Sequence, residues 1–220
     1  MSTVVLPLAT RSLSDAVQAA LREWIVTEGA GTGDLVTEVG VAARFGVARP
    51  TARVAVERLL AEGLLVRDGR RGARVPVLSA DDVHDLYASR VLLERDAHAR
   101  LSTDRTVPAA AVAANTRLRT HAGAGEAAGV AAADVEFHRR LVTATGSRRL
   151  DRMHELLMAE AHLCMGQVQH RHLLTGTVIA DEHQGILEAI SAGDARLAAE
   201  RTTDHLLAAR DKLLVALGAD

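Results

Sequence analysis

Three histidines and one aspartate occupy positions from which they could together bind a metal ion. Asp134 and His138 lie four residues apart, so on a helix they share one face. His183 and His205 each have apolar neighbours at helical spacing. Three imidazoles and one carboxylate directed inward from three helices suit Zn²⁺, Ni²⁺ or Mn²⁺ with an open coordination position. Taken singly, each histidine is more typical of a surface or packed core residue, so the spacing leaves both interpretations open.

A second group of side chains suits contact with DNA. Eight arginines lie between residues 44 and 74 against three acidic residues, in a chain whose net charge is −2. Arg49, Thr51 and Arg53 stand at the start of an expected helix that follows a turn at Gly46. Arginine binds guanine O6 and N7 or a phosphate, and threonine contacts a phosphate or a thymine methyl group. This arrangement predicts a helix-turn-helix whose second helix enters the major groove. The opposite face of that helix is expected to be buried against the first helix and carries Val54, Leu59, Leu60 and Leu64.

The segment DGRRG, which begins at Asp68, is expected to be the turn of a hairpin between two short strands. Arg70, Arg71 and Gly72 at this wing tip suit contact with a phosphate or with the minor groove. Charge alone fits a solvated surface equally well. The order helix, helix, helix and wing, together with the local positive charge, favours DNA binding.

The elements that position these residues are almost all helical. Residues 1–78 are expected to form three helices and a two-stranded wing, and Pro76 precedes a change of pattern. A capping box at Ser79 then opens an all-helical domain over residues 79–220. Its expected helices run from the capping box to about residue 101 and then over 107–121, 130–145, 148–170, 177–191 and 194–217. The predicted fold class is therefore mainly α.

Composition narrows the class of protein further. Aromatic residues make up 2% of the 220 residues, which disfavours a β-sandwich or a barrel. Cys164 is the single cysteine, so no disulfide can form within the chain. The N-terminal segment is a poor signal peptide, and no apolar run is long enough to cross a membrane. We expect a soluble, cytoplasmic protein with no membrane partner.

Residues 46–56, GVARPTARVAV, resemble the winged helix-turn-helix of GntR-family transcription regulators, where this stretch usually reads close to GVSRTPVREAL. Both arginines are kept. Ala48 replaces a serine that caps the helix, Pro50 and Thr51 invert the usual order, and Val54 replaces an acid. The resemblance implies a DNA-binding domain in which the base contacts differ, because the hydroxyl has moved by one position.

Residues 80–217 resemble the FCD ligand-binding domain of the FadR subfamily. The resemblance is carried by DLYASRVLLE from Asp85, by D-x-x-x-H at 134–138, by HQGILEAISAGDARLA from residue 183 and by His205. In that family an aspartate and three histidines bind a divalent metal inside a helical bundle, and a small organic acid often completes the coordination. The resemblance therefore implies metal roles for Asp134, His138, His183 and His205. Ser147 stands where the family usually has asparagine.

Arg90 has two interpretations. It lies four residues before Glu94, so the two can form a structural ion pair along one helix. Alternatively, Arg90 points into the bundle and binds the carboxylate of an effector. Arg139 is a weaker candidate for that role because it lies about 100° around the helix from His138. The remaining histidines are expected to be exposed or packed.

Together these resemblances imply a transcription regulator and not an enzyme. Two half-sites require two recognition helices, so a homodimer on a pseudo-palindromic double-stranded DNA operator is expected, controlled by a small carboxylate effector. One alternative is a metal-sensing regulator, in which the ion itself is the signal. Another is a metallohydrolase that uses the Asp/His site. The second is disfavoured because Glu136, two residues from Asp134, points elsewhere on the helix and cannot be the general base.

Overall fold

A computed structural model describes residues 12–28, 33–69, 72–168 and 176–218. The chain divides after Pro76 into two compact units, which we describe separately. Within the described residues, no helix combines the length and the apolar composition needed to cross a membrane.

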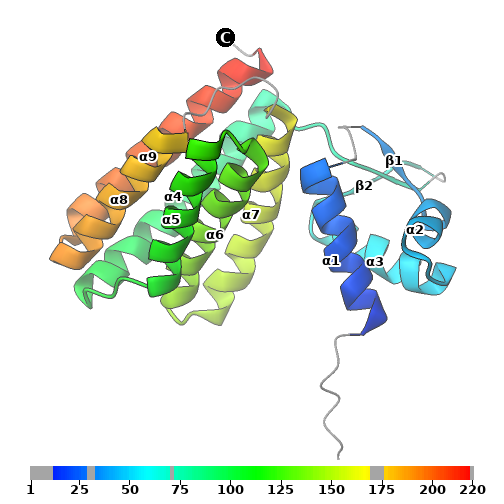
Figure 1. Cartoon of the computed structure of the whole chain (residues 1–220), viewed down its shortest axis with the longest axis horizontal. Helices are drawn as coiled ribbons and strands as arrows, with labels where there is room; N and C mark the ends of the chain where they lie inside the picture. Colours follow the sequence, from blue (N-terminus) through cyan, green and yellow to red (C-terminus); the bar gives the residue numbers. More distant parts are fainter. Residues whose placement is uncertain (1–11, 29–32, 70–71, 169–175, 219–220) are drawn as a thin grey trace, which may run out of the picture. The chain divides into compact units, whose positions relative to one another are not determined.

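Short helices and a small sheet make up the first unit (Figure 1). Helix α1 (Leu13–Glu23) continues into a π-helical turn η1 (Trp24–Glu28), and α2 (Glu38–Phe45) and α3 (Arg49–Ala61) follow the first strand. Ser12 and the side chain at the third helical position form a reciprocal capping box on α1, and Thr37 caps α2 through the backbone N–H of Gly40. Gly46, with φ 63°, ends α2 in the left-handed conformation and makes the turn into α3.

The sheet of the first unit corrects one prediction. Strands β2 (Val66–Arg67) and β3 (Ala73–Arg74) pair antiparallel as the expected wing, but β1 (Leu35–Val36) pairs with the other edge of β3. The order is therefore β1-β3-β2, with three strands where the sequence predicted two. Two residues are too few to show a period-2 pattern, which is why β1 escaped the sequence analysis.

Helix α3 buries one face and exposes the other. The buried residues Ala52, Ala55, Val56 and Leu59 follow the spacing i, i+3, i+4 and i+7. Val54, which the sequence analysis placed on the buried face, is 41% exposed and lies outside this stripe. The helix therefore keeps one side for packing against α1 and α2 and leaves the other to the solvent.

Ion pairs join α1 to α3. Arg58 donates hydrogen bonds to the side chains of Asp15 and Gln18, and Arg22 donates to Glu62 at 2.6 Å. The paired residues are 40 to 43 positions apart in the sequence, so these contacts fix how the two helices pack.

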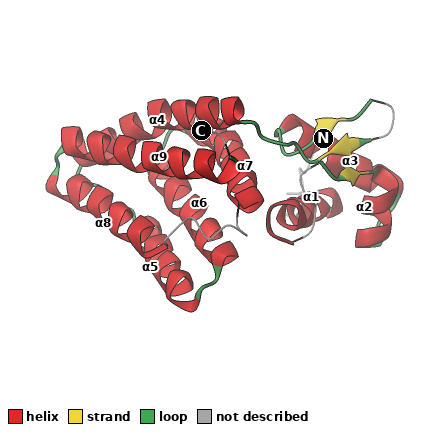
Figure 2. Ribbon diagram, turned by 90° about the horizontal axis from the view of Figure 1, so that it is seen from above, coloured by secondary structure: helices red, strands yellow, loops and turns green. Residues whose placement is uncertain are grey.

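Six long helices form the described part of the second unit (Figures 1 and 2). They are α4 (Ala80–Thr103), α5 (Ala109–Ala124), α6 (Ala127–Ala144), α7 (Arg148–Val168), α8 (Gly176–Ala192) and α9 (Ala195–Leu217). Helix α4 packs along α9, α5 packs against α6 and α8, and α6 packs against α7. The predicted capping box at Ser79 is present. Residues 122–132, most of which lie between two predicted helices, are themselves helical except at Gly125 and Glu126.

The core of the second unit has two main apolar clusters that share helices. One joins Tyr87 of α4 to Met165 and Leu206, and the other joins Phe137 of α6 to Ile186 of α8. Both clusters receive residues from α6, and the same helix carries Asp134 and His138. The candidate metal ligands are thus positioned by tightly packed helices and not by loops.

Candidate metal centre and nucleic-acid interface

The four predicted ligands meet in the interior of the second unit. Asp134 and His138 come from α6, His183 from α8 and His205 from α9, and one ligand atom of each lies within 4.8 Å of all the others. The Nε2 atoms of His205 and His138 are 3.2 Å apart, and those of His183 and His205 are 3.3 Å apart. Asp134 Oδ1 lies 3.4 Å from His183 Nε2. All four residues are buried.

Two carboxylates outside the cluster orient its imidazoles. His138 Nδ1 lies 2.6 Å from Glu94 Oε2, and His205 Nδ1 lies 2.6 Å from Glu182 Oε2. The ring of His183 stacks on Phe137 with centroids 3.7 Å apart. Such outer contacts fix the tautomer and the direction of a ligating histidine.

The pKa shifts favour neutral imidazoles at His138 and His183 beside an ionised carboxylate at Asp134. Burial lowers the pKa of His183 to about 3 and lowers the pKa of His138 as well. Burial alone would raise the pKa of Asp134, but the hydrogen bond with His183 and the neighbouring imidazoles hold it well below its ordinary value. Burial likewise opposes ionisation of Glu94, yet His138 and Arg90 keep its pKa well below the usual range.

This arrangement fits a divalent cation. With ionised Glu94 and Glu182 accepting from the Nδ1–H groups, the Nε2 atoms of His138 and His205 carry lone pairs that face each other across 3.2 Å. Lone pairs at this distance repel unless a cation lies between them. Ligand atoms about 2.1 Å from one ion, at tetrahedral or octahedral angles, are themselves about 3.0–3.4 Å apart. Three of the observed separations, 3.2, 3.3 and 3.4 Å, lie in this range, and Asp134 Oδ1 is 3.8 Å from His138 Nε2. Three imidazoles with one carboxylate suit Zn²⁺, Ni²⁺ or Mn²⁺.

Arg90 forms an ion pair and also has a hydrogen-bond donor that the ion pair does not use. Its Nε donates to Glu94 at 2.9 Å, so the ion pair considered in the sequence analysis exists, and both side chains are buried. Its Nη2 has no hydrogen-bond partner among the described residues. The guanidinium also lies 4.8 Å from the ring centroid of Tyr87. A buried donor without a partner is costly, so this atom is suited to receive an anionic ligand.

The candidate DNA-reading residues lie at the N-terminal end of α3. Arg49 and Arg53 are largely exposed, and each has a nitrogen 3.9 Å from a carboxylate oxygen of Glu38 on α2. Thr51 is half-buried between them. Ala48 makes no side-chain cap, in keeping with the loss of the usual serine. The two arginines therefore project from one face of the helix beside the same anionic side chain.

The wing tip is only partly within the described residues. Arg70 and Arg71, predicted to contact DNA, lie outside them. Gly72 has a φ of 133°, and a Cβ there would lie 3.1 Å from the carbonyl oxygen of Val36. A glycine is thus required at this position for the close approach of the wing to β1.

Models of known families match both units. Residues 13–75 match the family described as bacterial regulatory proteins, gntR family. Residues 85–208, more than half of the chain, match the FCD domain. The chain belongs to the GntR family of transcription regulators and carries an FCD domain.

Relatives of this GntR-type regulator cover different shares of it. The Nta operon transcriptional regulator of Aminobacter aminovorans is 35% identical over 112 residues, which are 50% of this chain and 53% of that protein. The probable D-xylose utilization operon transcriptional repressor of Paenarthrobacter nicotinovorans is 29% identical over 197 residues, 87% of this chain and 86% of that protein. A GntR regulator from Rhodococcus sp. RHA1 has a TM-score of 0.84 at 24% identity, over 96% of this chain and all of that one, and supports the fold.

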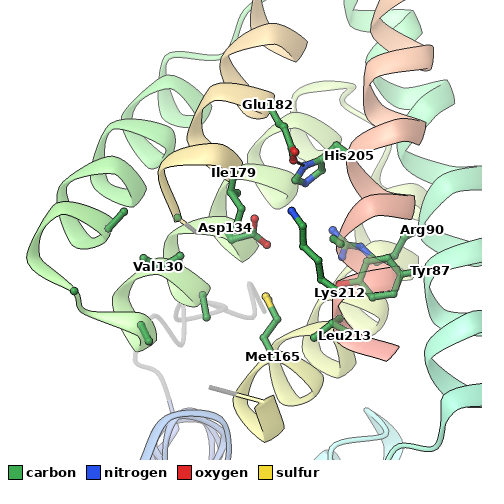
Figure 3. A pocket seen from close by; sticks show the side chains of 16 residues that line it. Tyr87, Arg90, Val130, Asp134, Met165, Ile179, Glu182, His205, Lys212 and Leu213 are labelled. Atoms are coloured by element: carbon green, nitrogen blue, oxygen red, sulfur yellow. Dashed lines mark hydrogen bonds and ion pairs between the residues drawn. The ribbon is translucent and has the colours of Figure 1, made fainter. Parts of the chain in front are cut away.

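A cavity of about 170 Å³ opens beside the candidate metal ligands of the FCD domain (Figure 3). Asp134 and His205 line it together with Arg90, Glu182 and Lys212. The rest of its described lining is aliphatic, small or aromatic: Tyr87, Ala122, Gly125, Ala127, Val130, Ala131, Met165, Gly176, Ile179, Ala209 and Leu213. The cavity is therefore polar where it meets the metal ligands and apolar elsewhere.

The sequence did not predict all residues of this site, or all contacts of the residues that it did predict. Glu94 was considered as a partner of Arg90, but not as a partner of His138. Glu182 and Lys212 were not singled out. Glu182 precedes His183 in the chain, and that adjacency was the one available signal. Their roles depend on which helices face each other, which a single sequence does not specify.

The remaining candidate residues do not belong to the Asp134, His138, His183 and His205 cluster. Arg139 pairs with Glu155, and His98 is buried against Thr202 at 2.7 Å. Burial lowers the pKa of His98 to about 3, consistent with a neutral core residue. Among the other histidines, His84 is exposed, His121 pairs with Glu126, His154 is buried near Glu94, His162 is partly buried, and His170 and His172 lie outside the described residues.

Proposed function

We propose that this regulator changes its affinity for an operator when a small organic acid binds at a divalent metal in the FCD domain. The observation that carries the proposal is the convergence of Asp134, His138, His183 and His205 beside a cavity into which Arg90 also projects. A bound ion would supply positive charge and an open coordination position for a carboxylate oxygen. Arg90 Nη2 is the protein's own donor for the same group.

The residues of the proposed metal centre have two roles, as ligands and as partners that orient the ligands. Asp134, His138, His183 and His205 are the ligands, and Zn²⁺, Ni²⁺ and Mn²⁺ are the candidate ions. Glu94 and Glu182 keep two of the imidazoles in the tautomer that offers Nε2. The cavity favours an organic effector over the alternative in which the ion alone is the signal, because an ion needs no apolar space beside its ligands.

We assign DNA contact to residues 1–78 and effector binding and dimerisation to residues 79–220. Arg49, Thr51 and Arg53 would contact the major groove, and Arg70, Arg71 and Gly72 the backbone or minor groove. A homodimer would match two half-sites of a pseudo-palindromic operator. We propose no enzymatic activity.

Metal content tests the centre directly. Purified protein, reconstituted with Zn²⁺, Ni²⁺ or Mn²⁺ and then dialysed, should retain about one ion per chain by elemental analysis. His183→Ala should lose most of it, and His183→Gln should behave alike if the loss reflects the ligand and not the vacated volume. His84→Ala is the matched control, because His84 is exposed and does not belong to the cluster. A wild-type protein that retains none of the three ions would overturn the assignment.

A further inference from the structure

The residues that line the cavity limit which acids it can bind. Figure 3 shows the side chain of Lys212 on α9 reaching toward Asp134 and His205, on the same side of the cavity as Arg90. Lys212 is half-buried and is the single lysine among the chain's 26 basic residues. A compact ammonium gives the ligand a point charge where the larger, planar fork of arginine would fill more of the cavity.

Formal charges at this end leave room for one anion. The positive charges of Arg90 and Lys212 are offset by Glu94 and Glu182. The two positive charges of a divalent ion would exceed the single negative charge of Asp134 by one. A single carboxylate neutralises this surplus, whereas a tricarboxylate would leave buried negative charge without a partner.

Away from Glu182 and His205, the described lining offers no polar side chain to a hydroxyl group. Figure 3 shows Val130, Met165 and Leu213 on this side of the cavity. A buried hydroxyl that finds no hydrogen-bond partner is destabilising, while each buried methylene group is stabilising. A dry apolar cavity of about 150 Å³ holds benzene, so the volume of about 170 Å³ is sufficient for a tail of about six carbons.

We infer that the cavity binds a monocarboxylic acid with an apolar tail, and that Lys212 is a specificity-determining contact for its head group. The inference rests on the function proposed above. It separates the effector of this chain from sugar acids and from polycarboxylates, which share the acidic head but not the apolar remainder or the single charge.

Hexanoate and gluconate form a matched pair of probes, because each has six carbons and one carboxylate. Calorimetric titration of the metal-reconstituted full chain should show hexanoate binding at least tenfold more tightly than gluconate or citrate. Along the series acetate, butyrate and hexanoate, affinity should rise about fourfold for each added methylene. Equal or tighter binding of gluconate or citrate, or an affinity that does not change with chain length, would overturn the inference.

Lys212→Met tests the head-group contact while keeping the length of the side chain. It should weaken hexanoate binding at least tenfold, and Lys212→Arg should restore part of the loss. Arg196→Met is the matched control, since Arg196 lies on the same helix but is exposed and paired with Glu200. Unchanged binding by Lys212→Met would remove Lys212 from the site.

Metal content and operator binding, measured on the same preparations, separate the two proposals. A protein that retains no ion contradicts the proposed function. A protein that retains its ion and binds a sugar acid or polycarboxylate most tightly contradicts only the inference about Lys212 and the apolar tail.

Discussion

The carboxylate of Glu94 is shared by three side chains. Arg90 Nε lies 2.9 Å away, His138 Nδ1 2.6 Å and His154 Nε2 3.2 Å. Arg90 borders the cavity and His138 belongs to the candidate metal cluster, so one buried residue connects the two. A ligand that draws Arg90 toward itself would therefore change the partner that orients His138.

Arg49 and Arg53 carry the first prediction at the residue scale. If each arginine reads a base, Arg49→Ala or Arg53→Ala should cost about 1–3 kcal/mol of operator affinity. The loss should be larger for the operator than for unrelated DNA, because phosphate contacts weaken binding to all sequences alike. Fluorescence anisotropy with both DNAs at a fixed salt concentration measures the difference.

The matched control for these variants is Arg196→Ala, which removes an exposed arginine of the second unit. It should leave the affinity for both DNAs unchanged. Normal operator binding by the Arg49→Ala/Arg53→Ala double variant, with a circular dichroism spectrum like that of the wild type, would show that α3 is not the reading helix.

At the scale of elements, the sequence predicted helices well and pairings between them poorly. The capping box predicted at Ser79 is present on α4, because capping depends on neighbours within one helical turn. The gathering of Asp134 with three distant histidines came from family resemblance, since spacing left it open. Val54 was wrongly assigned to the buried face of α3, because a helix rich in small residues allows more than one buried stripe at i, i+3 and i+4 spacing. The role of Lys212 could not be predicted from the sequence, because it depends on which helices surround the cavity.

The ion pair between Asp15 and Arg58 predicts how the packing of α1 on α3 depends on pH. The hydrogen bond from Arg58, followed by that of Ser12, lowers the pKa of Asp15 from its ordinary value of 3.8 to about 2. Because the folded state holds the ionised carboxylate, the stabilisation is complete above about pH 4 and is lost as the pH falls toward 2. Asp15→Asn should therefore be less stable than the wild type at neutral pH, and the gap should narrow below pH 4.

Urea denaturation of both proteins over this pH range, followed by circular dichroism, measures the gap. Asp211→Asn is the control, because that carboxylate is exposed and pairs with the adjacent Arg210. A difference between Asp15→Asn and the wild type that stays constant from pH 6 to pH 3 would show that the pair does not contribute to stability.

At the scale of the whole molecule, the proposed effector site and the proposed DNA-binding residues lie in two different units of one chain. The units divide after Pro76, and α4 begins at Ala80, so few residues separate β3 from the helix that carries Arg90 and Glu94. An effector shifts operator affinity only if it binds the DNA-competent and DNA-incompetent forms differently. Because the proposed ligands span α6, α8 and α9, an acid bound at a metal ion there would act on three helices at once.

The expected coupling between effector and operator is about 1–3 kcal/mol, which corresponds to a change of about 5- to 150-fold in operator affinity. Operator binding titrated with hexanoate, gluconate and citrate, for the wild type and for His205→Ala, measures it. His205 borders the cavity and contributes one ligand atom, so its loss should abolish the response while Arg49 and Arg53 still bind DNA. If an acid shifts the wild type and His205→Ala equally, the metal is structural and the effector acts from another part of the molecule.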